Sequence, residues 1–158
     1  MREPSVDTDR LNRWLTLGAN IGVLAGLIFL VVEIRHTNDL ARASAYRSRG
    51  AEIQEAHQAV ALDPELSRIL LKSNQQGIDG LTDHERIRYT YWQIAAQLRM
   101  QNQFNDYQMG FLDEEIYQSA LDAAAERYDL WMELGVPIED PEFKAAIESV
   151  REPRANSE

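Results

Sequence analysis

The sequence predicts an all-α protein in which one N-terminal transmembrane helix continues into a stalk, followed by a small bundle of about four helices. The first supporting observation is a run of nineteen residues without a charge, at 14–32. The second is apolar residues at helical spacing in the later chain, bounded by helix start and stop signals. The third is the lack of any segment that alternates β-branched and polar residues as strands do.

The uncharged run is long enough to cross a bilayer. At about 1.5 Å per residue it spans roughly 28 Å, close to the ~30 Å hydrocarbon core of a membrane. A helix satisfies its own backbone hydrogen bonds in lipid, and Trp14 is typical of the aromatic belt at the membrane edge. A cleaved signal peptide is the alternative, but the Ala41-Arg42-Ala43 sequence that imitates a cleavage site lies about nine residues beyond the apolar run. We therefore expect a retained anchor at 14–33, after an N-terminal tail at 1–13.

Glycines recur every four residues within the anchor and fall on one stripe of the helix. Small residues at this spacing let a second helix approach closely, which drives helix association in lipid. The predicted helix–helix interface comprises Gly18, Gly22, Ala25, Gly26 and Phe29.

Two polar residues of the anchor have more than one interpretation. Asn20 lies about 160° from the middle of the glycine stripe. It therefore either forms a second interhelical contact or reaches headgroups and water. Glu33 marks the other membrane edge, where it is solvated or paired with Arg35 or a neighbouring chain. Both residues are expected to make the polar contacts of the membrane helix.

A basic segment follows the anchor and is expected to contact anionic lipid, at about 1 kcal/mol for each arginine near the surface. Its members are Arg35, Arg42, Arg47 and Arg49. Three arginines precede the span and four follow it. This small excess favours a cytoplasmic position for the soluble part.

The anchor carries a resemblance. Its pattern Asn20-x-Gly22-x3-Gly26-x2-Phe29-Leu30-x2-Glu33-Ile34-Arg35 resembles the start of an uncharacterised group of bacterial single-pass membrane proteins with a helical C-terminal domain. That group shares an Asp-Pro-Glu-Leu turn, here at 63–66, and usually has Gln-Asn after the arginine, where this chain has His36-Thr37-Asn38. The resemblance implies bacterial inner-membrane attachment and carries no activity or catalytic residue.

A helical stalk is expected at 34–62, because no proline interrupts this alanine- and arginine-rich stretch. Gly50 is either tolerated there or forms a kink. Asp63-Pro64 then starts a short helix to about residue 73, and residues 74–80 read as a loop. The soluble helical domain therefore covers 63–151.

Within that domain, Thr82-x-x-Glu85 predicts a capping box for a long central helix over 83–107. Two apolar stripes on this helix predict contacts on more than one side. One stripe has Ile87, Tyr91, Ile94, Ala95 and Leu98, and the other has Tyr89, Trp92, Ala96, Phe104 and Tyr107.

The last two helices have similar signals. Asp113 is the expected cap of a helix that ends at Gly135, and Asp140-Pro141 starts a final helix. Residues 152–158 are expected to be a disordered tail.

Composition excludes several functions. Residues 51–158 hold nine basic and twenty-one acidic side chains, so this part repels phosphate and we expect no nucleic-acid partner. No cysteine is present, and Glu33-x-x-His36 is a single pair where a di-iron bundle needs two. His84-Glu85 lacks the second histidine of a zinc-protease motif. We expect no catalytic residue, no metal and no cofactor.

The sequence therefore predicts a membrane-anchored interaction or scaffold module. Its partners would be membrane lipid and either further copies of itself or other membrane-protein subunits. The alternative is a membrane-tethered sensor or carrier that binds an apolar small molecule among the aromatic residues of the helical domain. These residues are Tyr89, Tyr91, Trp92, Phe104, Tyr107, Tyr128 and Trp131, which at helical spacing also suit a core.

Overall fold

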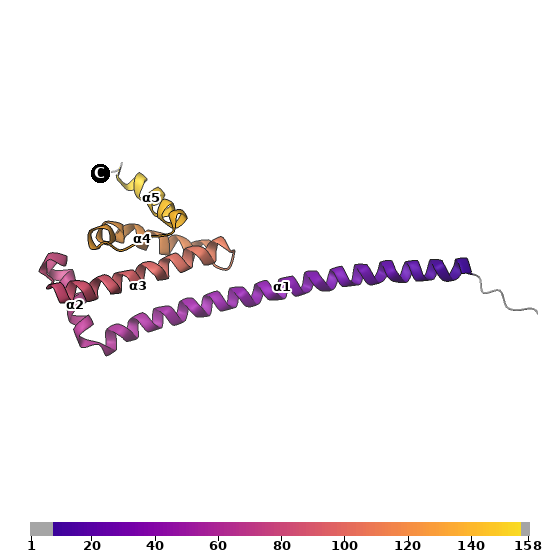
Figure 1. Ribbon diagram of the computed structural model, residues 1–158, viewed down its shortest axis with the longest axis horizontal. Helices are drawn as coiled ribbons and strands as arrows, with labels where there is room; N and C mark the ends of the chain where they lie inside the picture. The colour runs from indigo at the N-terminus through magenta and orange to yellow at the C-terminus, as the bar shows by residue number, and fades with distance from the viewer. Residues whose placement is uncertain (1–7, 156–158) are drawn as a thin grey trace, which may run out of the picture. The chain divides into compact units, whose positions relative to one another are not determined.

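The computed structural model describes residues 8–155 and confirms the all-α prediction: all regular structure in this range is helical, with five α-helices and one 3-10 turn. The chain divides into two units, residues 1–41 and 42–158, and the boundary falls within the first helix. The helices are coloured along the chain in Figure 1.

Helix α1 runs from Thr8 to Leu62 without interruption. Gly50 lies inside it and does not interrupt it. The helix contains the one segment of the described residues that is long and apolar enough to cross a membrane. None of that apolar segment is buried within the protein, whereas the core helix of a water-soluble domain is mostly buried. Helix α1 therefore carries a candidate membrane span.

Asp63 ends α1 and starts α2, Pro64–Gln76, as the Asp-Pro signal predicts. Its Oδ1 accepts the backbone N–H groups of Glu65 and Leu66, both at 3.0 Å. The helix continues three residues past the predicted end at 73, and a 3-10 turn, η1 (Ile78–Gly80), occupies part of the predicted loop. The extension occurs because Asn and Gln tolerate a helix, which ends only at Gly77.

The central helix α3, Asp83–Gln108, begins with the predicted capping box. The Thr82 hydroxyl accepts the N–H of Glu85 at 3.4 Å, and the Glu85 carboxylate accepts the N–H of Thr82 at 2.9 Å. Lys72 of α2 also donates to this carboxylate at 2.6 Å. These contacts lower the pKa of Glu85 to about 2, chiefly through the Lys72 and Thr82 hydrogen bonds.

Helix α4, Glu114–Leu134, ends at Gly135, whose φ of 68° is left-handed as predicted for a glycine stop. Its expected cap is wrong in detail. Asp113 occupies the N-cap position but makes no capping hydrogen bond. Its Oδ2 instead accepts the hydroxyl of Tyr46, because α1 brings that donor to the carboxylate.

Helix α5, Pro141–Ala155, starts with the predicted Asp140 cap, whose Oδ1 accepts the N–H groups of Glu142 and Phe143. Its bounds include residues 152–155 of the predicted tail, and residues 156–158 lie outside the described range. Arg151 donates to Asp129 of α4 at 2.7 Å.

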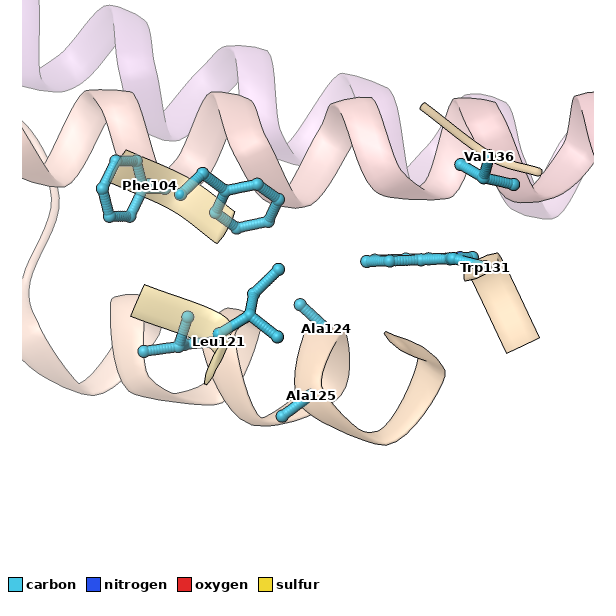
Figure 2. Close-up of a cluster of buried hydrophobic side chains, with 8 residues drawn as sticks. Phe104, Leu121, Ala124, Ala125, Trp131 and Val136 are labelled. Atoms are coloured by element: carbon cyan, nitrogen blue, oxygen red, sulfur yellow. The ribbon is translucent and has the colours of Figure 1, made fainter. Parts of the chain in front are cut away.

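The main core lies where α4 packs between α3 and α5 (Figure 1). Figure 2 shows side chains of this core, among them Phe104 of α3 and Leu121 and Trp131 of α4, and Trp131 is 0% exposed. The buried members are Phe104, Leu121, Ala124, Ala125, Trp131, Val136, Phe143 and Ile147. A smaller cluster joins α2, η1 and α3 through Ile69, Ile78, Leu81 and Tyr89.

Helix α3 contacts more than one neighbour, as its two stripes predict, since it packs against both α2 and α4. The first stripe is nevertheless mostly exposed. Ile87, Tyr91 and Leu98 are 57%, 70% and 51% exposed, and of this stripe Ile94 packs against the main core. The core face instead includes two glutamines. Gln93 accepts the indole N–H of Trp131 at 3.2 Å, and Gln97 donates to Gln101 at 2.7 Å. Each buried amide is satisfied in this way, so polar residues occupy positions that an apolar pattern cannot reveal.

Candidate functional site

The predicted helix–helix interface lies on a fully exposed part of α1. Gly18, Gly22 and Gly26 are one turn apart, and a methyl group built at any of them would meet no atom within 4 Å. Phe29, one turn further, is 70% exposed. Ala25 is exposed on the same helix. The space directly beside the three glycines is therefore open.

The polar residues of the candidate span are also exposed. Asn20 and Glu33 have exposed side chains, and the backbone carbonyl of Glu33 accepts the Thr37 hydroxyl at 2.9 Å. The contact between Thr37 and Glu33 is formed within α1. For Asn20 both interpretations stay predictions.

The four arginines expected at the membrane surface separate into two kinds. Arg42 donates through Nε to the carbonyl of Gly110 at 3.0 Å, and Arg49 donates to Gln103 at 3.3 Å. Both guanidinium groups thus connect α1 with the C-terminal end of α3. Arg35 and Arg47 are exposed, and no intramolecular hydrogen bond or ion pair is found for them among the described residues.

The structure brings together a second feature that the sequence did not predict: an open groove of about 590 Å³ between residues 52–59 of α1 and helix α3. Its walls are predominantly apolar. Small residues create the space, since Ala56 and Ala59 of α1 face Ala95 of α3. Tyr91, Trp92 and Leu98 complete the apolar surface.

The two ends of the groove differ in their charges. At one end Arg88 forms ion pairs with both Asp63 and Glu65, which ties the corner between α1 and α2 to α3. At the other end Asn102 donates to Glu52 at 3.5 Å. Arg99 lies beside them, with its guanidinium 5.5 Å from the centre of the Trp92 ring.

Arg99 is partly removed from water at this end of the groove. Burial lowers the pKa of its guanidinium, and the nearby charge of Glu52 opposes that effect. Among the described residues no carboxylate lies within ion-pair distance of Arg99. The groove therefore presents a partly desolvated cation next to an apolar surface.

The predicted aromatic set does not form one pocket. Phe104 and Trp131 belong to the core, and Tyr89 to the smaller cluster. Tyr107 stacks on Tyr117 and donates its hydroxyl to Glu114. Only two of the seven predicted aromatic residues, Tyr91 and Trp92, line the groove.

The histidines lie outside any cluster that resembles a metal site. In the part of the chain that the structure describes, no three His, Asp or Glu side chains converge as metal ligands. His84 lies 3.8 Å from the Glu65 carboxylate with an exposed ring, and His36 and His57 are exposed on α1.

Comparisons with protein-family models, with curated proteins and with solved structures find no match for this chain. Two features of the molecule are candidates for its function: the exposed stripe of α1 and the groove between α1 and α3.

Proposed function

We propose that this protein is a membrane-anchored helical interaction module. In this proposal residues 14–33 of α1 lie in a bilayer, and residues 42–155 form a domain in water. Association occurs through the glycine stripe. The observation that carries the proposal is the unbroken exposure of the apolar side chains along α1.

Exposing these apolar side chains to water would cost more free energy than the folding of a domain commonly supplies. Twelve large apolar side chains between Trp14 and Val32 are exposed. At ~1.5 kcal/mol each, removing them from water is worth about 18 kcal/mol. A whole domain is commonly stable by only about 5–15 kcal/mol, so this segment requires lipid or protein around it. Its length and lack of charge favour lipid.

The glycine stripe supports association within the bilayer. Lipid provides no hydrophobic drive for helices to meet, so close packing at small residues and polar contacts must supply the attraction. The backbone at Gly18, Gly22 and Gly26 is open to such an approach. A second copy of the chain is the simplest partner because the stripe is complementary to itself. A different membrane-protein subunit would use the same face.

The polar residues have supporting roles in this proposal. Asn20 would bond a further helix or water near the interface, and Glu33 would lie at the far membrane edge. Arg35 and Arg47 would contact anionic lipid, while Arg42 and Arg49 already donate within the domain. The small excess of arginine after the span favours a cytoplasmic position for the domain, and the resemblance of the anchor implies a bacterial inner membrane.

The test is energy transfer between labelled copies of the full chain in lipid vesicles, with Gly22→Ile as the variant. A branched side chain at the centre of the stripe should lower association at least about tenfold, equivalent to ~1.4 kcal/mol. Leu24→Phe adds bulk about 160° away and is the matched control. Unchanged association of Gly22→Ile, or an equal loss in Leu24→Phe, would remove the basis of the proposal.

A further inference from the structure

The groove between α1 and α3 has a shape that restricts what can bind in it. Along α3 it extends from Arg88 to Asn102, about 21 Å at helical rise. The groove provides about 590 Å³, which is within the range of small-molecule sites. A narrow, extended ligand therefore fits along it.

The surface inside the groove requires an apolar body. Its central walls are formed by Ala56 and Ala59 on one side and by Trp92, Ala95 and Leu98 on the other. Leu98 lines this surface and is 51% exposed. Covering this surface removes apolar area from water, which is favourable in proportion to the area.

A cation at one end of the groove can hold a negative head. Arg99 is partly desolvated, lies 5.5 Å from the centre of the Trp92 ring, and lacks an ion-pair partner among the described residues. Its planar guanidinium can hold a carboxylate through two parallel hydrogen bonds. Glu52 and Glu55 also line the groove, and their negative charges limit the head to a single charge and disfavour a phosphate dianion.

The geometry points to a long-chain fatty carboxylate as the ligand of this groove, with its head on Arg99 and its chain along Ala56, Ala59 and Ala95. The bilayer around residues 14–33 is the source of this amphiphile. Only this source depends on the proposed function, and the binding site does not. The site itself uses none of the glycine-stripe residues. It would make the helical domain responsive to free fatty acid, which self-association of the anchor does not.

The test is photolabelling of the full chain in phosphatidylcholine nanodiscs. The probe is palmitic acid with a mid-chain diazirine, and the comparator is hexadecanol with the same diazirine. The acid should label peptides that contain residues 52–59 and 91–102. Arg99→Gln should reduce this labelling roughly tenfold or more, the usual worth of a charged hydrogen bond. The alcohol should label the wild-type groove only at that reduced level.

Two variants separate the groove from the rest of the helix surface. Arg86→Gln removes an arginine of α3 that does not line the groove and should leave labelling unchanged. Ala95→Trp fills the groove and should abolish labelling. Leu71→Trp adds an indole to an exposed position on α2, outside the groove, and controls for that change. Arg99→Gln keeps the test decisive if Ala95→Trp does not fold.

Several results would overturn the inference. One is label confined to residues 14–32, which are expected to take up the probe simply because they lie in lipid. Another is equal labelling by acid and alcohol, which would indicate a merely apolar surface. A third is a groove that takes up no label while a second copy crosslinks there. Gly22→Ile should leave groove labelling unchanged, so failure of this inference and failure of the proposed self-association are distinguishable.

Discussion

The two units of this chain are both helical, but their apolar residues have opposite surroundings. Along residues 10–40 every described side chain is exposed, including the apolar ones. In residues 42–155 the large apolar side chains of Trp131, Phe143 and Ile147 are almost completely buried. Helix formation alone therefore does not show whether a segment lies in lipid or in water. A helix that satisfies its backbone internally is compatible with lipid, whereas a bundle that buries its side chains requires water around it.

The largest expected effect comes from removing the central side chain of the core. Trp131→Ala should destabilise the helical domain by about 3–5 kcal/mol, because it leaves a cavity and removes the partner of Gln93. Urea denaturation of the full chain in nanodiscs, followed by near-ultraviolet circular dichroism, would measure it. Membrane retention should not change. Loss of retention in this variant would contradict the independence of the two units.

The converse variant places a charge in the candidate span. Leu24→Arg should cost about 2.5–3.5 kcal/mol of insertion free energy, since arginine is unfavourable at the centre of a membrane helix. The fraction of protein that resists alkaline extraction from membranes should fall, while the urea midpoint of the domain stays constant. Leu71→Arg, at an exposed position of α2, is the control and should leave membrane retention unchanged.

A smaller effect is expected from the buried amide of α3. Gln93→Leu keeps the approximate size of the side chain but leaves the indole N–H of Trp131 without its acceptor. The expected loss of stability is about 1–3 kcal/mol, the cost of a buried donor left unpaired. Gln108→Leu, at an exposed position near the end of α3, is the control in the same urea experiment.

Acid should destabilise the domain through Glu85. Its pKa is about 2 in the folded chain, below the ordinary 4.5, so the folded state binds fewer protons than the unfolded state between these values. The stability that Glu85 contributes is complete above about pH 4.5 and is lost as the pH falls toward about 2. Glu85→Gln should lower stability at neutral pH and flatten the pH dependence in this window. Glu115→Gln, an exposed carboxylate of α4, should retain the wild-type slope.

The smallest predicted effects come from replacing two glycines by alanine, which should change the stability in opposite directions. Gly135→Ala should destabilise by about 1–2 kcal/mol, because the left-handed φ of 68° is unfavourable for a side chain. Gly50→Ala should stabilise α1 by about 0.5–1 kcal/mol, since the added methyl meets no atom within 4 Å and alanine favours a helix. Thermal denaturation of the two variants would check both signs.

Local chemistry explains what could be predicted from the sequence. The Asp63 and Asp140 caps, the Thr82 capping box and the Gly135 stop each depend on residues within one helical turn, so their patterns are visible without the fold. The candidate span is visible for the same reason, because length and lack of charge are properties of one segment.

Packing between distant segments explains what could not be predicted. The exposed stripe of Ile87, Tyr91 and Leu98 has the same spacing as a core face, and only the satisfied amides of Gln93 and Gln97 reverse the assignment. The groove depends on small alanines from α1 and α3 meeting across more than thirty residues of chain. Arg99 in the sequence is one arginine among many, and its surroundings exist only in the fold.

The most direct test is to fractionate the full-length chain produced without detergent. The protein should sediment with membranes, resist alkaline extraction and enter solution only when detergent is added. Full-length protein that stays in the supernatant as a freely soluble monomer would contradict the placement of residues 14–32 in lipid, and with it the interaction module built on that segment.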